Sequence, residues 1–184
     1  GYWSRGLGDV YKRQGNGKKD WMHCNSIDYN ESLQQIVIGS RSMSEFYIID
    51  HSTTTTQASS SSGGIYGRGG DFLYRWGNPQ VYNKGNSSNR RLFGQHDVQW
   101  IEDGLADEKK ILIFNNGQSR GYSSVEIVNT QFQNSGYYQL STMGTFIPDS
   151  SEWIYVADNP TDFFSSYISG AVSYTHLTLP TNSN

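Results

Sequence analysis

The residues best suited to chemistry in this sequence are two histidines, His23 and His96, which are 73 positions apart. Each stands at the start of a segment with the alternating pattern of a β-strand. Imidazole can transfer protons or attack an electrophile near neutral pH. If the two segments are equivalent strands of a repeated unit, both rings face one shared site. The alternative is that each histidine only caps the end of its strand through a hydrogen bond.

Arginine and amide side chains follow the second predicted strand of each unit. Arg41 comes directly after one such strand, and Arg120 comes a few residues after the other, beyond Asn115 and Asn116. A guanidinium offers a planar fork of donors that suits a tetrahedral oxyanion such as sulfate or phosphate, and amides add neutral donors. We therefore predict that Arg41, Asn115 and Asn116 bind substrate. The alternative is that these residues only form turns, since Asn-Gly is also a common turn pair.

The elements that must position these residues are predicted to be β-strands, because no segment has sustained helical spacing. The expected strands cover residues 22–29, 34–40, 45–50 and 71–76, and then 96–101, 110–114, 123–129 and 152–157. The Thr-, Ser- and Gly-rich stretch 52–70 is expected to be a mobile surface loop.

The second set of strands repeats the first at a spacing of about 70 to 80 residues, which is typical of radially repeated sheets. We therefore predict an all-β fold that is a fragment of a β-propeller, with a β-sandwich as the alternative. Blade one covers about 21–76, blade two about 96–157, and the first strand of a third blade begins within 164–171. The innermost strands of a propeller line its central channel, so His23 and His96 would face that channel.

Composition excludes several classes of function. The chain has 14 Lys and Arg against 17 Asp and Glu, a net charge of −3 and no basic run, which argues against nucleic-acid binding. No apolar stretch reaches the roughly 18 residues of a membrane span. The single cysteine, Cys24, cannot form an internal disulfide or complete a Cys-rich zinc site, and no phosphate-binding loop is present. We expect no metal and no cofactor.

The two ends of the chain are expected to be foreign to it. Residues 9–14 can be written in codons whose reverse complement encodes residues 172–177, and this DNA resembles the transposon end of sequencing-library adapters. We therefore predict that 1–14 and 172–184 are adapter-derived, and that 15–171 is part of a longer protein.

Four groups of residues, in order, resemble bacterial arylsulfate sulfotransferases. They are Asp20-Trp21-Met22-His23-Cys24-Asn25-Ser26, Ile38-Gly39-Ser40-Arg41, Gln95-His96-Asp97 and Phe114-Asn115-Asn116-Gly117 with Arg120. The resemblance covers most of 20–170 and implies a six-bladed propeller, periplasmic or secreted. It implies a ping-pong transfer of a sulfuryl group from a phenolic sulfate to a phenol, without a nucleotide sulfate donor.

The resemblance also implies roles for particular residues. His23 and His96 correspond to channel histidines that bind and polarise the sulfate, and Arg120 to the arginine that stabilises its charge. The nucleophilic histidine of the family lies in a later blade, so we expect this piece alone to be inactive. Asn115 stands where many relatives carry Asp. The alternative function is a non-catalytic extracellular propeller that binds a glycan or a protein through the loops 52–70 and 83–89.

Overall fold

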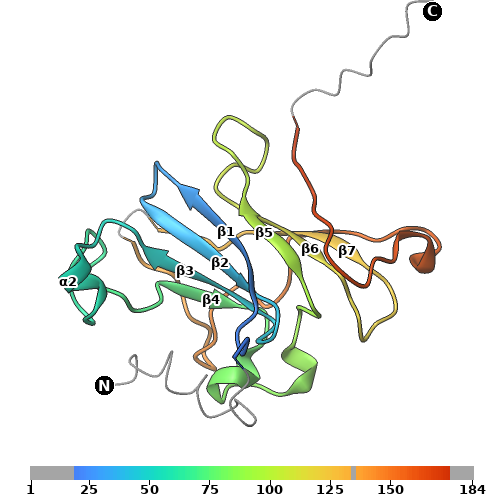
Figure 1. Ribbon diagram of the computed structural model, residues 1–184, viewed down its shortest axis with the longest axis horizontal. Coiled ribbons are helices and arrows are strands. Elements are labelled where there is room, and N and C mark those ends of the chain that lie inside the picture. The colour runs from blue at the N-terminus through green and yellow to red at the C-terminus, as the bar shows by residue number, and fades with distance from the viewer. Residues whose placement is uncertain (1–18, 134–135, 175–184) are drawn as a thin grey trace, which may run out of the picture.

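The computed structural model describes residues 19–133 and 136–174 of the chain (Figure 1). The end segment 1–14 and most of 172–184, both predicted to be adapter-derived, lie outside these residues. No helix within the described ranges has the length and apolar character needed to cross a membrane.

Two four-stranded antiparallel sheets make up the fold, and in each sheet the strands follow their order in the sequence. The first contains β1 (Cys24–Asn30), β2 (Gln35–Ser40), β3 (Glu45–Asp50) and β4 (Tyr74–Trp76), and the second contains β5 (His96–Trp100), β6 (Ile111–Asn115), β7 (Ser124–Val128) and β8 (Trp153–Tyr155). The short helices are α2 (Thr55–Ala58), η2 (Pro79–Tyr82), η3 (Ser87–Asn89) and η4 (Pro160–Phe163). The all-β prediction is confirmed, and the two sheets are consistent with two blades of a propeller.

The spacing between equivalent positions of the two units changes along the chain. Leu73 N donates to Ile48 O just before β4, and Glu152 N donates to Ile127 O just before β8, each at 2.8 Å. These equivalent positions are 79 residues apart, whereas the Asn-Pro pairs that open η2 and η4 are 81 apart. An alignment at 81 throughout therefore misplaces the outer strand by two residues, because the second unit has two extra residues between its last strand and its Asn-Pro pair.

The inner strands β1 and β5 lie side by side and are joined by side chains rather than by a backbone ladder (Figure 1). Ser26 Oγ accepts a hydrogen bond from Val98 N at 3.1 Å, and Asp28 Oδ2 accepts one from Trp100 N at 2.8 Å. Asn25 Nδ2 donates to the backbone oxygen of Gln95 at 2.8 Å. Alternate residues of one inner strand thus satisfy the backbone of the next.

The same relation continues from β5 to the segment that follows η4. Ala171 N donates to Asp97 Oδ2 and Gln99 Nε2 donates to Ala171 O, both at 2.9 Å. The segment 164–171 therefore lies where the inner strand of a third blade is expected, but the structure forms no strand there. The reason is that a strand needs a partner in its own sheet, and the described residues supply none after it.

A shared core joins the sheets. It contains Phe46, Ile48, Tyr74 and Trp76 from the first sheet and Val98, Ile111 and Ile113 from the second. Gly39 permits the close approach, since a Cβ at this position would lie 3.0 Å from Val98 Cγ2 and 2.3 Å from Ser26 Oγ. The sheets therefore pack as one body.

The connection between β7 and β8 returns to cover the first sheet (orange in Figure 1). Tyr138 Oη donates to Gln35 Oε1 at 2.6 Å. Tyr74 Oη donates to Ile147 O at 2.9 Å, and Trp76 Nε1 donates to the next backbone oxygen, that of Pro148, at 2.6 Å. The second unit thus closes the core of the first.

The Thr- and Ser-rich segment is tied to the first sheet, which differs from the mobile loop expected. Thr54 caps helix α2. The carboxylate of Asp50 accepts hydrogen bonds from Ser52 N at 2.8 Å and from Tyr66 N at 3.3 Å, and Tyr66 Oη donates to Leu33 O. Low sequence complexity alone did not indicate these contacts, which join single residues of the segment to Asp50 and Leu33.

We predict that Asp28→Ala lowers the free energy of unfolding by about 1–3 kcal/mol, because the buried Trp100 N–H loses its acceptor. Urea unfolding followed by tryptophan fluorescence measures the change. The matched control is Asp103→Ala, in an exposed turn, which should stay within about 0.5 kcal/mol of the parent. Equal losses in the two variants would refute a special role for the bond between the inner strands.

Candidate functional site

His96 begins β5, and its half-buried ring is held by two oxygens. Its Nδ1 lies 2.7 Å from Asn116 Oδ1 and 3.1 Å from Gly94 O. Asn116 is fully buried, and its Nδ2 donates to Ser165 O at 2.8 Å and to Ile168 O at 2.7 Å. The structure therefore brings together two of the predicted residues, His96 and Asn116, in direct contact.

His23 precedes β1 and has a different environment. Its side chain is 41% exposed, and its Nδ1 is paired with Asp20. Its carbonyl oxygen accepts from Arg41 N at 3.1 Å, so these two predicted residues are neighbours through the backbone. Among the described residues no hydrogen bond or ion pair joins the side chain of His23 to His96 or Arg120.

The two histidines do not occupy equivalent positions, contrary to the expectation from their spacing. His96 lies opposite Phe114 in the ladder of β5 and β6, whereas Ser26 lies opposite Gly39 in the ladder of β1 and β2. Gly39 and Phe114 hold equivalent places when the sheets are matched from their outer strands inwards. His96 thus corresponds to Ser26 and not to His23, because the inner strands are interrupted by bulges at different points.

Arg41 is exposed to solvent on one side and reaches across to the second sheet. Its Nη2 donates to Gln118 Oε1 at 3.0 Å. Gln118 in turn donates from Nε2 to Ser166 O at 2.7 Å, and its backbone N–H donates to Phe93 O at 3.2 Å. The sequence analysis did not select Gln118, because a single glutamine in a polar turn does not indicate a functional role.

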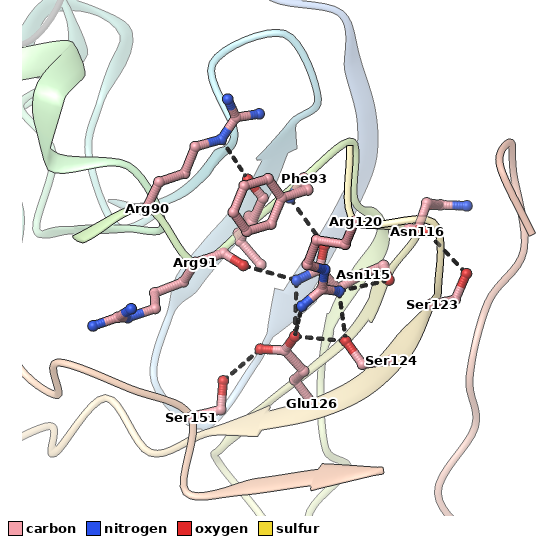
Figure 2. Close-up of polar contacts among 11 residues, drawn as sticks. Arg90, Arg91, Phe93, Asn115, Asn116, Arg120, Ser123, Ser124, Glu126 and Ser151 are labelled. Carbon is pink, nitrogen blue, oxygen red and sulfur yellow. Dashed lines mark hydrogen bonds and ion pairs between the residues drawn. The ribbon is translucent and has the colours of Figure 1, made fainter. Parts of the chain in front are cut away.

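Arg120 lies in the loop after β6, in a cluster with Phe93, Ser124 and Glu126. In Figure 2 its guanidinium lies between the Phe93 ring and the carboxylate of Glu126, with a centroid distance of 5.2 Å and an ion pair of 3.9 Å. Its Nη2 donates to Ser124 Oγ at 2.9 Å, and a second aromatic ring, that of Tyr122, lies 4.6 Å away. Its Nε has no hydrogen-bond partner among the described residues.

Asn115 is fully buried, and both ends of its amide are occupied (Figure 2). Oδ1 accepts from Phe93 N at 2.9 Å, while Nδ2 donates to Arg91 O at 2.9 Å and to Glu126 Oε1 at 2.8 Å. Ser151 Oγ donates to the other oxygen of Glu126 at 2.6 Å. Asn115 thus holds the loop that carries Asn116 and Arg120, and contact with a substrate would require these bonds to be exchanged.

An open groove of about 760 Å³ runs between the inner strands. Its walls include Cys24, Asn25 and Asp28 from β1 and Asp97 and Gln99 from β5. Partial burial, with the nearby Asp20 carboxylate, raises the pKa of the Cys24 thiol, which disfavours the nucleophilic thiolate. In the described part of the chain no group of three His, Cys, Asp or Glu residues is arranged to hold a metal ion.

The model of the family described as arylsulfotransferase (ASST) matches residues 6–178 of the chain. A comparison with curated proteins finds no match.

We predict that Asn115→Asp lowers the free energy of unfolding by about 1–3 kcal/mol. The change removes the amide donor from Arg91 O and places a second acid beside the buried Glu126. Urea unfolding measures it, with Asn83→Asp in an exposed loop as the control. If both variants keep the parent stability, Asn115 is not the structural support described here.

Proposed function

The chain belongs to the arylsulfotransferase (ASST) family, and on that basis we propose that it is part of an enzyme that moves a sulfuryl group from an aryl sulfate to a phenolic acceptor. The family match carries the proposal, because it covers 6–178 and includes His23, His96 and Arg120. The partners proposed are small molecules, a phenolic sulfate and a phenol, and the proposed location is periplasmic or secreted.

The proposed reaction has two halves that balance. In the first, the bond between sulfur and the aryl oxygen breaks, a bond from sulfur to an enzyme nucleophile forms, and the phenolate takes up a proton. In the second, a phenol loses its proton, attacks the sulfur and releases the nucleophile. Negative charge develops on the leaving oxygen in the first half, so fixed hydrogen-bond donors and cations there lower the barrier.

The contacts of His96 support its part in this chemistry. The ring is tethered at Nδ1 by two oxygens, at 2.7 and 3.1 Å, so Nε2 is the nitrogen left for a substrate. We assign His96 to binding the sulfate, together with His23. Arg41 can add a donor, because only one of its contacts, to Gln118 Oε1, is with a side chain.

Arg120 is assigned to the charge of the transferred group. Two of its polar contacts are long, 3.9 Å to Glu126 Oε1 and 3.5 Å to Asn115 O, and its Nε has no partner among the described residues. These are the contacts that a sulfate would most readily replace, since a sulfate offers a guanidinium closely spaced oxygen acceptors. The shorter bond to Ser124 Oγ would keep the side chain in place meanwhile.

We expect His23→Ala, His96→Ala and Arg120→Ala each to lower turnover at least about tenfold in the complete protein that carries this sequence, as for loss of a charge-stabilising donor. The assay follows release of a chromogenic phenol from its sulfate ester, with and without added phenol. Release that depends on added phenol supports transfer.

The matched control is His51→Ala, since the ring of His51 packs against Tyr29 at 4.7 Å outside the candidate site and its loss should leave turnover within about twofold of the parent. Unchanged turnover in all three test variants would contradict the assignment of His23, His96 and Arg120 to the site. Release without added phenol would indicate hydrolysis instead of transfer. No release from a folded protein would favour the alternative function, a non-catalytic propeller that binds a glycan or a protein.

A further inference from the structure

We propose that Asn116 is the positioning residue of the site: it fixes which nitrogen of His96 carries the proton, and it does so only while the segment 165–168 is seated beside it. This inference rests on the proposed function for its catalytic meaning. The geometry that carries it does not depend on any turnover.

The orientation of the Asn116 amide follows from its partners. One end of the amide lies 2.8 Å from Ser165 O and 2.7 Å from Ile168 O. Both partners are backbone carbonyls, which only accept hydrogen bonds, so this end must be the NH₂ group with its two donors. The oxygen of the amide therefore faces the ring of His96, at 2.7 Å.

The proton of His96 follows from that orientation. Its Nδ1 meets two acceptors, Asn116 Oδ1 and Gly94 O, and no donor from the described residues contacts this nitrogen. A nitrogen between two acceptors must carry hydrogen. In the neutral ring Nε2 then keeps its lone pair and can take up a proton from a phenol, and the protonated ring donates from Nε2 to the sulfate that His96 is proposed to bind.

The segment 165–168 is part of this arrangement through a second residue. Ser123 Oγ lies 2.9 Å from Asn116 O and also accepts from Ser165 N at 2.9 Å. Gln118 Nε2 donates to Ser166 O, which adds a third tie between the loop after β6 and this segment. Because the two carbonyls of the segment hold the amide, its displacement frees Asn116 to turn and present NH₂ to the ring instead.

The test reads the tautomer directly from the imidazole ¹⁵N chemical shifts of the chain labelled with ¹⁵N-histidine, without substrate. The sequence has four histidines, and His96→Gln identifies the signals of His96 by their loss. In spectra of the neutral ring, recorded in alkaline buffer, we expect protonated Nδ1 and unprotonated Nε2 for His96. The opposite tautomer in the parent chain overturns the proposal without any further variant.

Two substitutions separate positioning from a merely structural role. Asn116→Asp keeps an acceptor toward His96 but loses both donors to the segment, whereas Asn116→Ala loses all three. We expect the proton to stay on Nδ1 in Asn116→Asp and to move to Nε2 in at least about half of the molecules in Asn116→Ala. A ring that keeps its proton on Nδ1 in Asn116→Ala, or that behaves alike in both variants, contradicts the assignment.

Asn159→Ala is the matched control, because this exposed amide contacts Asp162 and Thr161 and bonds neither His96 nor the segment 165–168. It should leave the tautomer as in the parent. Since every readout is taken without substrate, failure here is distinct from failure of the proposed transfer, which would show as absent turnover with the tautomer unchanged.

Discussion

Side-chain oxygens on β1 that accept from the backbone of β5 set the spacing on which the rest of the structure depends. A backbone ladder would hold the strands about 4.8 Å apart and merge the sheets into one. Ser26 and Asp28 instead put the length of a side chain between them, while still satisfying the buried N–H groups of Val98 and Trp100. The groove between the inner strands exists because of this spacing, and the ends of the same strands carry the two histidines.

Each sheet buries a carboxylate that accepts a hydrogen bond from a hydroxyl two residues away in the same strand. The order of the acid and the hydroxyl along the strand is reversed between the two sheets. Glu45 in β3 is fully buried, accepts from Tyr47 Oη two residues along, and is paired with Arg75 of β4; burial raises the pKa of Glu45, and the guanidinium opposes that rise. In β7 the hydroxyl comes first and the acid second, as Ser124 and Glu126, and the arginine comes from a loop. An arginine on a loop can be shared with a ligand, whereas one within a strand is held by the sheet.

Alternation and turn residues were enough to predict both sheets and the loop that carries Asn116, because these signals are local. The hydrogen bonds that hold the candidate site together are not local. The partner of Asn116 at Ser165 lies 49 positions away, and Arg41 meets Gln118 across 77. Spacing alone also wrongly predicted that His23 and His96 are equivalent, because a bulge adds one residue to a strand and shifts which residues face each other across the ladder. Such contacts and irregularities depend on packing, which a single sequence does not display.

The return of the β7–β8 connection over the first sheet has a consequence for the order in which the molecule can be made. Tyr74 and Trp76 find their polar partners 73 and 72 residues later in the chain. On a ribosome, the first sheet therefore emerges with its outer strand unfinished and must wait for most of the second unit to be synthesised. The two units consequently form one cooperative folding unit, and neither sheet is an independent foldon of the kind that simple tandem repeats provide.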